Sequence, residues 1–388
     1  MYDPSLVWGV VSKISLPVGG KISMKIVVLG RGLAGCFTAL HYKYFSPYVE
    51  VELIHDSDIP TQIVGQGTLP DVPTMLWNTL EMNWYDNPIK ATIKTGILYD
   101  GWGGKTDNWF HPFHLDSAAM HYDSHSLQNY ILENGDFKVT DRNINSYDDV
   151  DADYIFDCRG FPPSYDDYDF LTNPIDSVVL GRGPMSNIQW TQAIATPDGW
   201  CLVIPTLEQT SYGYLYNSTL TSRGKAHENF ESIIDPDEIF HDFSFKNYVA
   251  KNPVIDERII LNGNRLFFLE PLEATALSVY MYWIRYTYDW IILKNTHPKE
   301  ISSIIKKLIH EVENFVLYHY LHGSKYETSF WKTAKVLKIK DLKFWERMND
   351  ALSTKDPLTK ENSKDYGIWE LISFKQMYDG LQTKDLNT

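Results

Sequence analysis

The sequence predicts an α/β protein built on a doubly wound sheet, and three observations support this prediction. Residues 25–29 are an aliphatic run with the composition of a strand buried on both faces. The motif Gly30-x-Gly32-x-x-Gly35 follows at once and leads into an amphipathic helical stretch from Cys36. A second aliphatic run over 49–55 completes a strand–helix–strand unit, which is how dinucleotide-binding sheets begin.

Each glycine of the motif has a distinct expected role. Gly30 permits the tight turn, Gly32 lets the backbone approach a pyrophosphate, and Gly35 lets the helix pack closely on the strand. The phosphates would lie at the helix N-terminus, where free N–H groups favour an anion. Such folds usually end the second strand with an acidic residue that binds a ribose hydroxyl. Here His55 occupies that place and Asp56 follows it, so either side chain could form this hydrogen bond.

Composition excludes several classes of function. The 388 residues are 44% hydrophobic and 22% charged, which is typical of a globular chain long enough for two domains or one large domain. A formal charge of −15 argues against binding to nucleic acid or to an anionic membrane surface. Three scattered cysteines predict neither a disulfide scaffold nor a zinc site, and indicate a reducing compartment. The aromatic content of 14% is high enough to fill the core and also to line a pocket for flat ligands.

Residues 1–23 have no basic segment before their short apolar run, so we interpret them as an extension rather than a secretory signal and expect a cytoplasmic protein. The loop over 59–70 is rich in Gly and Pro, as in a segment that approaches a ligand. Residues 87–102 are a strand candidate in which Lys90 and Lys94 would face the same side.

Four histidines, His111, His114, His121 and His125, lie close together in the sequence, but Pro112 interrupts them and no carboxylate completes a metal-ligand set. We therefore expect no metal site, and expect a helix after His121 that is capped by Asp123 or Ser124.

The second half predicts further strands and then helices. A buried strand over 153–157 ends in a polar turn, where doubly wound sheets place ligand contacts. Residues 161–255 alternate short strand patterns with turns, as in an antiparallel sheet that covers a substrate. Residues 299–320 have helical spacing, and the apolar stretch 277–293 is too short and too charged to span a bilayer. The polar last residues are expected to be peripheral.

Six segments, in order, match motifs of the flavin-dependent halogenases of the tryptophan halogenase type, and the chain resembles the compact virus-encoded members most. The segments are Gly30-x-Gly32-x-x-Gly35; Gly65-Gln66-Gly67-Thr68-Leu-Pro70; Ile89-Lys90-Ala-Thr-Ile-Lys94; Trp200-Cys-Leu202-Val-Ile204-Pro205; Phe268-Leu-Glu270-Pro-Leu-Glu273-Ala-Thr275-Ala276; and His319-Tyr with Ser329-Phe-Trp331. The chain departs from the family pattern at seven of these positions, where the family has Glu, Ala, Phe, Trp, Ser, Gly and Pro: Gln66, Gly67, Ile89, Leu202, Ala274, Ala276 and Ser329.

The resemblance implies an FAD-binding, Rossmann-like fold of the flavin monooxygenase type, with an antiparallel sheet and a helical substrate-covering region. It implies an extension (1–23), one halogenase module (24–350) and a peripheral segment (351–388). Within the module, FAD-binding elements would be 24–100, 136–160 and 259–276, and 161–258 and 277–350 would cover the substrate. The residues it assigns to FAD are Gly30, Gly32, Leu33, Ala34, Gly35, His55, Gly65, Thr68, Gly263 and Pro271.

The activity implied by the resemblance is halogenation of a small electron-rich aromatic compound resembling an indole, phenol or aniline. Reduced FAD, supplied by a separate flavin reductase, would react with O2 to give a flavin hydroperoxide, and halide would convert this into hypohalous acid. The resemblance assigns Lys90 to relay that acid, as a hydrogen-bonding ammonium or as a haloamine. It assigns Glu273 to orient the electrophile or accept the ring proton, Thr275 and Ala276 to bind halide, and Trp200, Ile204 and Pro205 to form an apolar barrier between substrate and flavin.

Halide, substrate and oligomeric state are less constrained. Ala276 in place of glycine suggests a preference for bromide and iodide, which are more easily oxidised than chloride. A homo-oligomer is compatible with the sequence. One alternative is a flavin monooxygenase or reductase on the same fold, in which the organic substrate would touch the flavin and the product would carry no halogen. Another is a non-catalytic flavin-binding protein.

Overall fold

The computed structural model describes residues 24–60, 65–103, 108–113, 119–338, 342–354, 368–369 and 371–381. The predicted extension over 1–23 and His114 lie outside these residues, as do parts of the 59–70 loop and of the C-terminal segment. The strand–turn–helix start is confirmed as β1 (Lys25–Leu29), α1 (Leu33–Phe45) and β2 (Glu50–His55).

β1 lies inside a six-stranded sheet of order β17-β18-β9-β1-β2-β8. The other strands are β8 (Lys138–Asp141), β9 (Tyr154–Asp157), β17 (Val254–Ile255) and β18 (Ile259–Leu261). Every pairing is parallel except that of β17 with β18, so the predicted α/β fold with a doubly wound sheet is confirmed. The β1 side chains of Ile26 and Val28 are fully buried, as the aliphatic run predicts.

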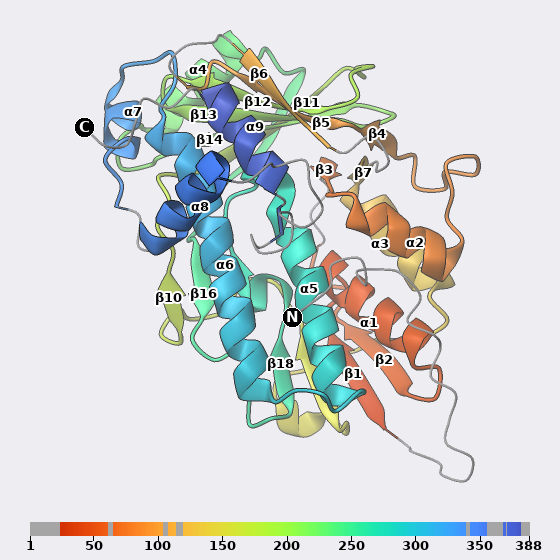
Figure 1. Cartoon of the computed structure of the whole chain (residues 1–388). Coiled ribbons are helices and arrows are strands. Elements are labelled where there is room, and N and C mark those ends of the chain that lie inside the picture. The colour runs from red at the N-terminus through yellow and green to blue at the C-terminus, as the bar shows by residue number, and fades with distance from the viewer. Residues whose placement is uncertain are drawn as a thin grey trace.

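A second, seven-stranded sheet has the order β15-β11-β14-β13-β12-β5-β6 and lies at the top of Figure 1, above the six-stranded sheet. Its strands are β5 (Gly96–Asp100), β6 (Asn108–Pro112), β11 (Ser177–Gly183), β12 (Thr191–Thr196), β13 (Gly199–Pro205), β14 (Thr210–Tyr216) and β15 (Glu238–Ser244). The predicted antiparallel sheet is therefore present, but β5 and β6 join it from outside the expected range, and β5 pairs with β12 in parallel.

Alternation of side chains gives this sheet two apolar faces. One face packs under α4 (Arg223–Ile233) with a small core of its own that includes Val179, Val203 and Phe230. The opposite face looks toward the six-stranded sheet. Two three-stranded sheets join the layers: β3 (Gly65–Gly67), β7 (Ala119–Asp123) and β4 (Thr92–Lys94), and β10 (Tyr168–Phe170), β16 (Tyr248–Ala250) and β19 (Phe267–Phe268).

Helices cover both layers. α2 (Asp71–Leu80) and α3 (Ser124–Asn134) lie beside α1, and Asp123 caps α3 by accepting from the Ser126 N–H at 2.8 Å, as predicted. α5 (Thr275–Ile291) and α6 (Pro298–Leu321) pack side by side along the molecule (Figure 1). Among the described residues, no helix is long and apolar enough to cross a membrane.

The C-terminal helices are α7 (Ser329–Ala334), α8 (Leu342–Thr354) and α9 (Leu371–Leu381). The expectation that 351–388 is peripheral is wrong for α9, which packs on β6. Phe374 and Met377 are buried there, and the Trp369 ring stacks on Phe315 of α6 with centroids 3.7 Å apart. The apolar face of α9 outweighs the polar average of the segment, because burial depends on periodicity rather than on mean composition.

Candidate active site

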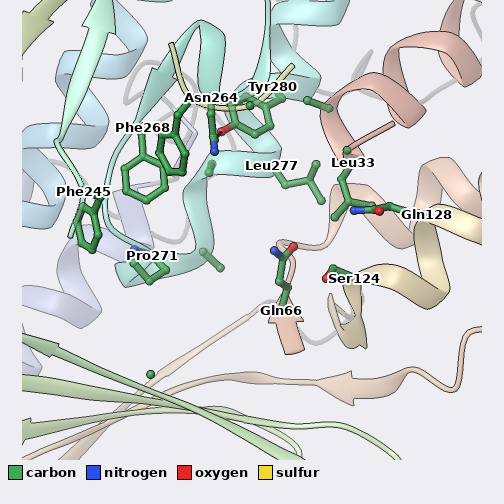
Figure 2. A pocket seen from close by; sticks show the side chains of 18 of the residues that line it. Leu33, Gln66, Ser124, Gln128, Phe245, Asn264, Phe268, Pro271, Leu277 and Tyr280 are labelled. Carbon is green, nitrogen blue, oxygen red and sulfur yellow. Dashed lines mark hydrogen bonds between the residues drawn. The ribbon is translucent and has the colours of Figure 1, made fainter. Parts of the chain in front are cut away.

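A cavity of about 770 Å³ lies between the two large sheets and extends to the first glycine motif. Figure 2 shows Phe245, Phe268 and Pro271 toward one end of it and Leu33 and Gln128 toward the other. Both sheets contribute to its wall, so strands that are far apart in sequence form a single binding site.

The glycine motif has the geometry that a dinucleotide needs. Gly30 has φ +102°, and a Cβ there would lie 2.7 Å from the Cys158 carbonyl oxygen. A Cβ at Gly35 would lie 2.0 Å from the Gly30 oxygen, so only glycine permits this close packing of helix and strand. Gly32 has open space around it and precedes α1, whose N-terminus has no side-chain cap. The free N–H groups at the N-terminus of α1 therefore face the cavity, as phosphate binding requires.

The end of β2 supports the same interpretation. His55 lines the cavity, and its buried Nδ1 has no hydrogen-bond partner within the described parts of the chain. Asp157 at the end of β9 is already bound by Arg159, whose Nε donates at 2.9 Å. Arg159 itself lines the cavity and adds positive charge near the glycine motif. The residues present therefore fit a dinucleotide such as FAD.

Most of the expected FAD residues line this cavity, including Leu33, Ala34, Gly65, Gly263 and Pro271. Gly263 has φ +60°, and a Cβ there would be 2.8 Å from that of Ala34, which explains why glycine is needed.

Thr68 is not part of the cavity wall. It is buried, and its Oγ1 accepts from the Met120 N–H at 3.0 Å. Its role is therefore to support the wall rather than to touch the cofactor. Gln66, where the family has Glu, lines the cavity and accepts from the Tyr122 hydroxyl at 2.9 Å.

The structure does not bring Lys90 to the cavity. Lys90 has φ +53°, its side chain is 58% exposed, and it forms an ion pair with Glu208. The reason is local: Asn87 closes a tight loop by bonding both backbone groups of Ala91, so residues 87–91 leave the predicted strand. The expectation that Lys90 and Lys94 face the same side is therefore wrong.

Lys94, unlike Lys90, lies on the cavity wall. It lies at the end of β4, is fully buried, lines the cavity, and donates from Nζ to the Thr68 carbonyl oxygen at 3.1 Å. Burial lowers the pKa of Lys94 to about 8, although the negative charge of Glu273 opposes this shift. Gly67 makes room for it, since a Cβ there would lie 3.2 Å from Nζ.

Glu273 is also buried and lines the cavity, in a backbone conformation of φ +69° that is costly for a non-glycine residue. Its Oε1 accepts from the Tyr99 hydroxyl and lies 3.2 Å from His111 Nδ1 and 3.3 Å from His319 Nε2. Burial alone would raise the pKa of Glu273, but the two histidines outweigh it and hold the pKa below its ordinary value. Oε2 has no hydrogen-bond partner among the described residues, so it is available to a ligand.

An aromatic cluster surrounds this carboxylate. The Tyr99 ring stacks on Trp109 with centroids 4.3 Å apart and on His319 at 5.0 Å. Trp109 is buried, and its Nε1 has no acceptor within the described chain. The cluster brings rings and a carboxylate together, as a site for an aromatic ligand would require.

Thr275 and Ala276 begin α5 on the cavity wall, as expected. The preceding Ala274 has φ +54° and no side chain caps the helix, so the first N–H groups of α5 remain available to an anion. Ala276 does not have positive φ and lies within the helix, so a glycine is not required there.

Two of the three expected barrier residues line the cavity, namely Trp200 and Ile204. Trp200 donates from Nε1 to Glu270 at 2.9 Å, and burial raises the pKa of Glu270 to about 7. Pro205 ends β13 outside the wall, and its carbonyl oxygen accepts from Thr92. Leu202, where the family has Trp, also lines the cavity.

Sequence reasoning missed the partners of Glu273, which are Tyr99, His111 and His319. The available signal was alternation along two adjacent strands, since Tyr99 pairs with Trp109 and His111 is two residues further along β6. The histidines of the 111–125 region do not act together. His121 bonds Thr191, whereas His111 bonds Glu273. Among the described residues, no group of three or more potential ligands is arranged to hold a metal ion.

Comparison with known proteins agrees with this geometry. A profile of the tryptophan halogenase family matches residues 25–154 and 168–384. The sequence is 23% identical to RebH, a tryptophan 7-halogenase of Lentzea aerocolonigenes, over 84% of this chain and 81% of that protein.

Two solved structures have the same fold. MibH, a lanthipeptide tryptophan 5-halogenase, superposes with a TM-score of 0.81 at 18% identity, covering 95% of this chain and 88% of that one. SttH, a tryptophan 6-halogenase from Streptomyces toxytricini, gives 0.77 at 19% identity and covers 92% and 90%.

Proposed function

Because this chain belongs to the tryptophan halogenase family, we propose that it uses FAD, O2 and halide to halogenate an electron-rich, indole-like aromatic substrate. The observation that carries the proposal is that one cavity has a dinucleotide-binding motif at one end and the buried pair Lys94 and Glu273 on its wall. When bound in reduced form, FAD would supply the electrons that activate O2, and the activated oxygen would oxidise halide to hypohalous acid. A separate flavin reductase would supply the reduced FAD.

The chain's own residues would bind the two anionic partners. The N-terminus of α1 beyond Gly32 would hold the pyrophosphate, and His55 would bond the adenosine ribose through its unpaired Nδ1. The uncapped N-terminus of α5 at Thr275 and Ala276 would hold the halide. Trp200 and Ile204 would keep bulk water and substrate away from the flavin.

We assign the relay of hypohalous acid to Lys94 rather than Lys90. Lys94 is a buried amine on the cavity wall whose lowered pKa allows either protonation state near neutral pH. As an ammonium it would donate a hydrogen bond to the oxygen of hypohalous acid, and as an amine it would form a haloamine. Lys90 and Lys94 both stand at lysine positions of the family motif Phe-Lys-x-x-Ile-Lys, Lys90 at the first and Lys94 at the last.

Glu273 would act on the substrate side. Its Oε2 is free to orient the electrophile or to accept the proton that the substituted ring releases. Tyr99, His111 and His319 hold Oε1 and so fix the direction of the carboxylate. The rings of Tyr99 and Trp109 support an adjacent position for the substrate.

Two finer proposals concern halide and lineage. We infer a preference for bromide and iodide, because the heavier halides are easier to oxidise than chloride and demand less of a halide site in which Ala276 replaces the family's glycine. The six matched motifs, in the family's order, support grouping the chain with the compact, virus-encoded members.

A flavin monooxygenase is the second candidate. Leu202 favours it, because the family's second barrier Trp is absent at a position on the cavity wall. Such an enzyme would release hydroxylated rather than halogenated product.

Product analysis tests the proposed function. The enzyme is incubated with FAD, a reductase system, O2, each halide and a panel containing tryptophan, indoles, phenols and anilines, and the products are identified by mass spectrometry. We expect halogenated product with bromide present that disappears in Lys94→Ala. Hydroxylated product would favour the monooxygenase, and bound FAD with no product would favour a flavin-binding protein.

A further inference from the structure

One line of directly paired residues across the seven-stranded sheet lacks a side chain at the cavity wall. Across the strands, Ala193 pairs with Leu202, Leu202 pairs with Gly213, and Gly213 pairs with Leu180. All four residues point to the same face, since directly paired residues share a face of the sheet. Gly213 therefore leaves a hollow between two leucines that line the cavity.

The hollow has room for added atoms. The nearest neighbours of a Cβ at Gly213 would be side-chain methyl groups of Val178, Leu180 and Leu215, at 3.6 to 3.8 Å. That is ordinary van der Waals contact, and Gly213 does not have positive φ. This glycine is thus required neither by backbone conformation nor by a close neighbour, unlike Gly30 or Gly35.

Aromatic side chains also line the cavity near the hollow, and Phe243 shares its sheet face because it pairs with Val178. Phe243, Phe245 and Phe268 line this end of the cavity, and the Phe245 and Phe268 rings pack with centroids 5.1 Å apart (Figure 2). The two polar side chains of this sheet face that line the cavity are already bonded, because Ser211 Oγ accepts from the Gly65 N–H and Thr191 bonds His121. An apolar slot without free polar groups selects a neutral, planar ligand.

We propose that the slot over Gly213, between Leu180 and Leu202, binds a small neutral aromatic molecule of one or two rings. Neighbouring strands lie about 4.8 Å apart, so a missing side chain between two leucines leaves a gap about as wide as a flat ring is thick. This site goes beyond the proposed function. It is separate from the aromatic cluster at Glu273, since Tyr99, Trp109 and His111 do not line this cavity. A ligand here would lie beside the cofactor and would also explain why this chain tolerates Leu202 where the family has the bulkier Trp.

Calorimetric titration with indole tests the slot without any turnover. Indole is titrated into the protein loaded with oxidised FAD, in the absence of halide and reductant. Leu202→Trp fills the slot and should weaken binding by at least about tenfold, whereas Leu202→Met conserves volume and should stay within about twofold. Lys90→Ala, at an exposed site outside the cavity wall, should leave this binding unchanged.

The control for folding is FAD affinity, which Leu202→Trp should retain. Should that variant lose FAD, Gly213→Ala decides the question, because its single methyl group enters the slot and should weaken indole binding by about threefold or more. Indole binding that is equal in wild type, Leu202→Trp and Gly213→Ala would overturn the proposal. So would absence of binding to the FAD-loaded wild type, since the flavin would then fill the slot. Halogenation assays are not involved, so failure here is distinguishable from failure of the proposed function.

Discussion

Lys90 and Lys94 belong to one short segment but have opposite environments. Lys90 lies in a loop closed by Asn87, is largely exposed, and its charge is balanced by Glu208. Lys94 lies at the end of a strand, is buried, and shares the cavity wall with Glu273. The difference shows that the loop over 87–91, rather than lysine spacing, decides which amine lies on the cavity wall. The predictions below test this contrast.

Removing each lysine should have very different effects on catalysis. Lys94→Ala is expected to lower the halogenation rate by about 10²- to 10⁴-fold, the range for loss of a proton-donating group in the reaction. Lys90→Ala is its matched control and should change the rate by less than about twofold, because an exposed ion pair contributes little. The assay is steady-state halogenation with FAD binding measured in parallel. A larger loss in Lys90→Ala than in Lys94→Ala would reverse the assignment.

Glu273 should be the acidic counterpart of Lys94. Glu273→Gln retains shape but removes the base, so turnover should fall at least about tenfold while FAD affinity stays unchanged. Single-turnover kinetics with excess reduced FAD would isolate this step. Near-normal turnover would leave Glu273 with only a structural role at the start of α5.

The pH dependence should separate the two chemical roles open to Lys94. Its pKa of about 8 lies well below that of an exposed lysine because of burial. If the ammonium donates to hypohalous acid, as we expect, the rate should fall as pH rises through 8. A rate that instead rises toward pH 8 would indicate the neutral amine and a haloamine.

As pH rises through the titration of Lys94, the free energy of unfolding should increase while the halogenation rate falls. The folded pKa lies below the unfolded value of 10.5, so the folded state binds fewer protons between pH 8 and 10.5 and gains stability as pH rises through that window. Below pH 8 the folded state bears the full free-energy cost of burying the charged ammonium, at most about 3 kcal/mol. Lys94→Met should remove this cost. Urea unfolding of both proteins at pH 7 measures the difference. A variant that is less stable than wild type at pH 7 would contradict the sign.

Glu208 should matter least. Glu208→Gln removes the partner of Lys90 at an exposed site, so the free energy of unfolding should change by less than about 1 kcal/mol. Halogenation should be unaffected. A large effect on turnover would connect the 87–91 loop to the reaction and weaken the contrast between the two lysines.

Much of this could be predicted from the sequence, for identifiable reasons. Local spacing of residues determines the structure of three predicted features, which are the glycine motif, the aliphatic strands and the Glu273–Ala276 segment. The sequence comparison assigned the relay to Lys90, because Lys90 falls on the first lysine of the family motif and Lys94 on the last. The loop closed by Asn87 gives the two lysines different environments. That loop depends on hydrogen bonds from the Asn87 side chain to the backbone of Ala91.

Long-range pairing accounts for the rest. His111 and His319 meet at Glu273 from a strand and a helix that are far apart in the chain, and nothing in their local sequence specifies this meeting. The hollow at Gly213 likewise depends on the register of three strands. The burial of α9 against β6 is a third example, since the average polarity of its segment hides one apolar face.

Competitive acylation of lysines, quantified by peptide mass spectrometry with and without bound FAD, tests the central contrast most directly. We expect Lys90 to react rapidly and equally in both states, because it is exposed. We expect Lys94 to react slowly and to be protected further by FAD, because it lies buried on the cavity wall. Rapid labelling of Lys94 that FAD does not change, together with protection of Lys90 by FAD, would contradict the account.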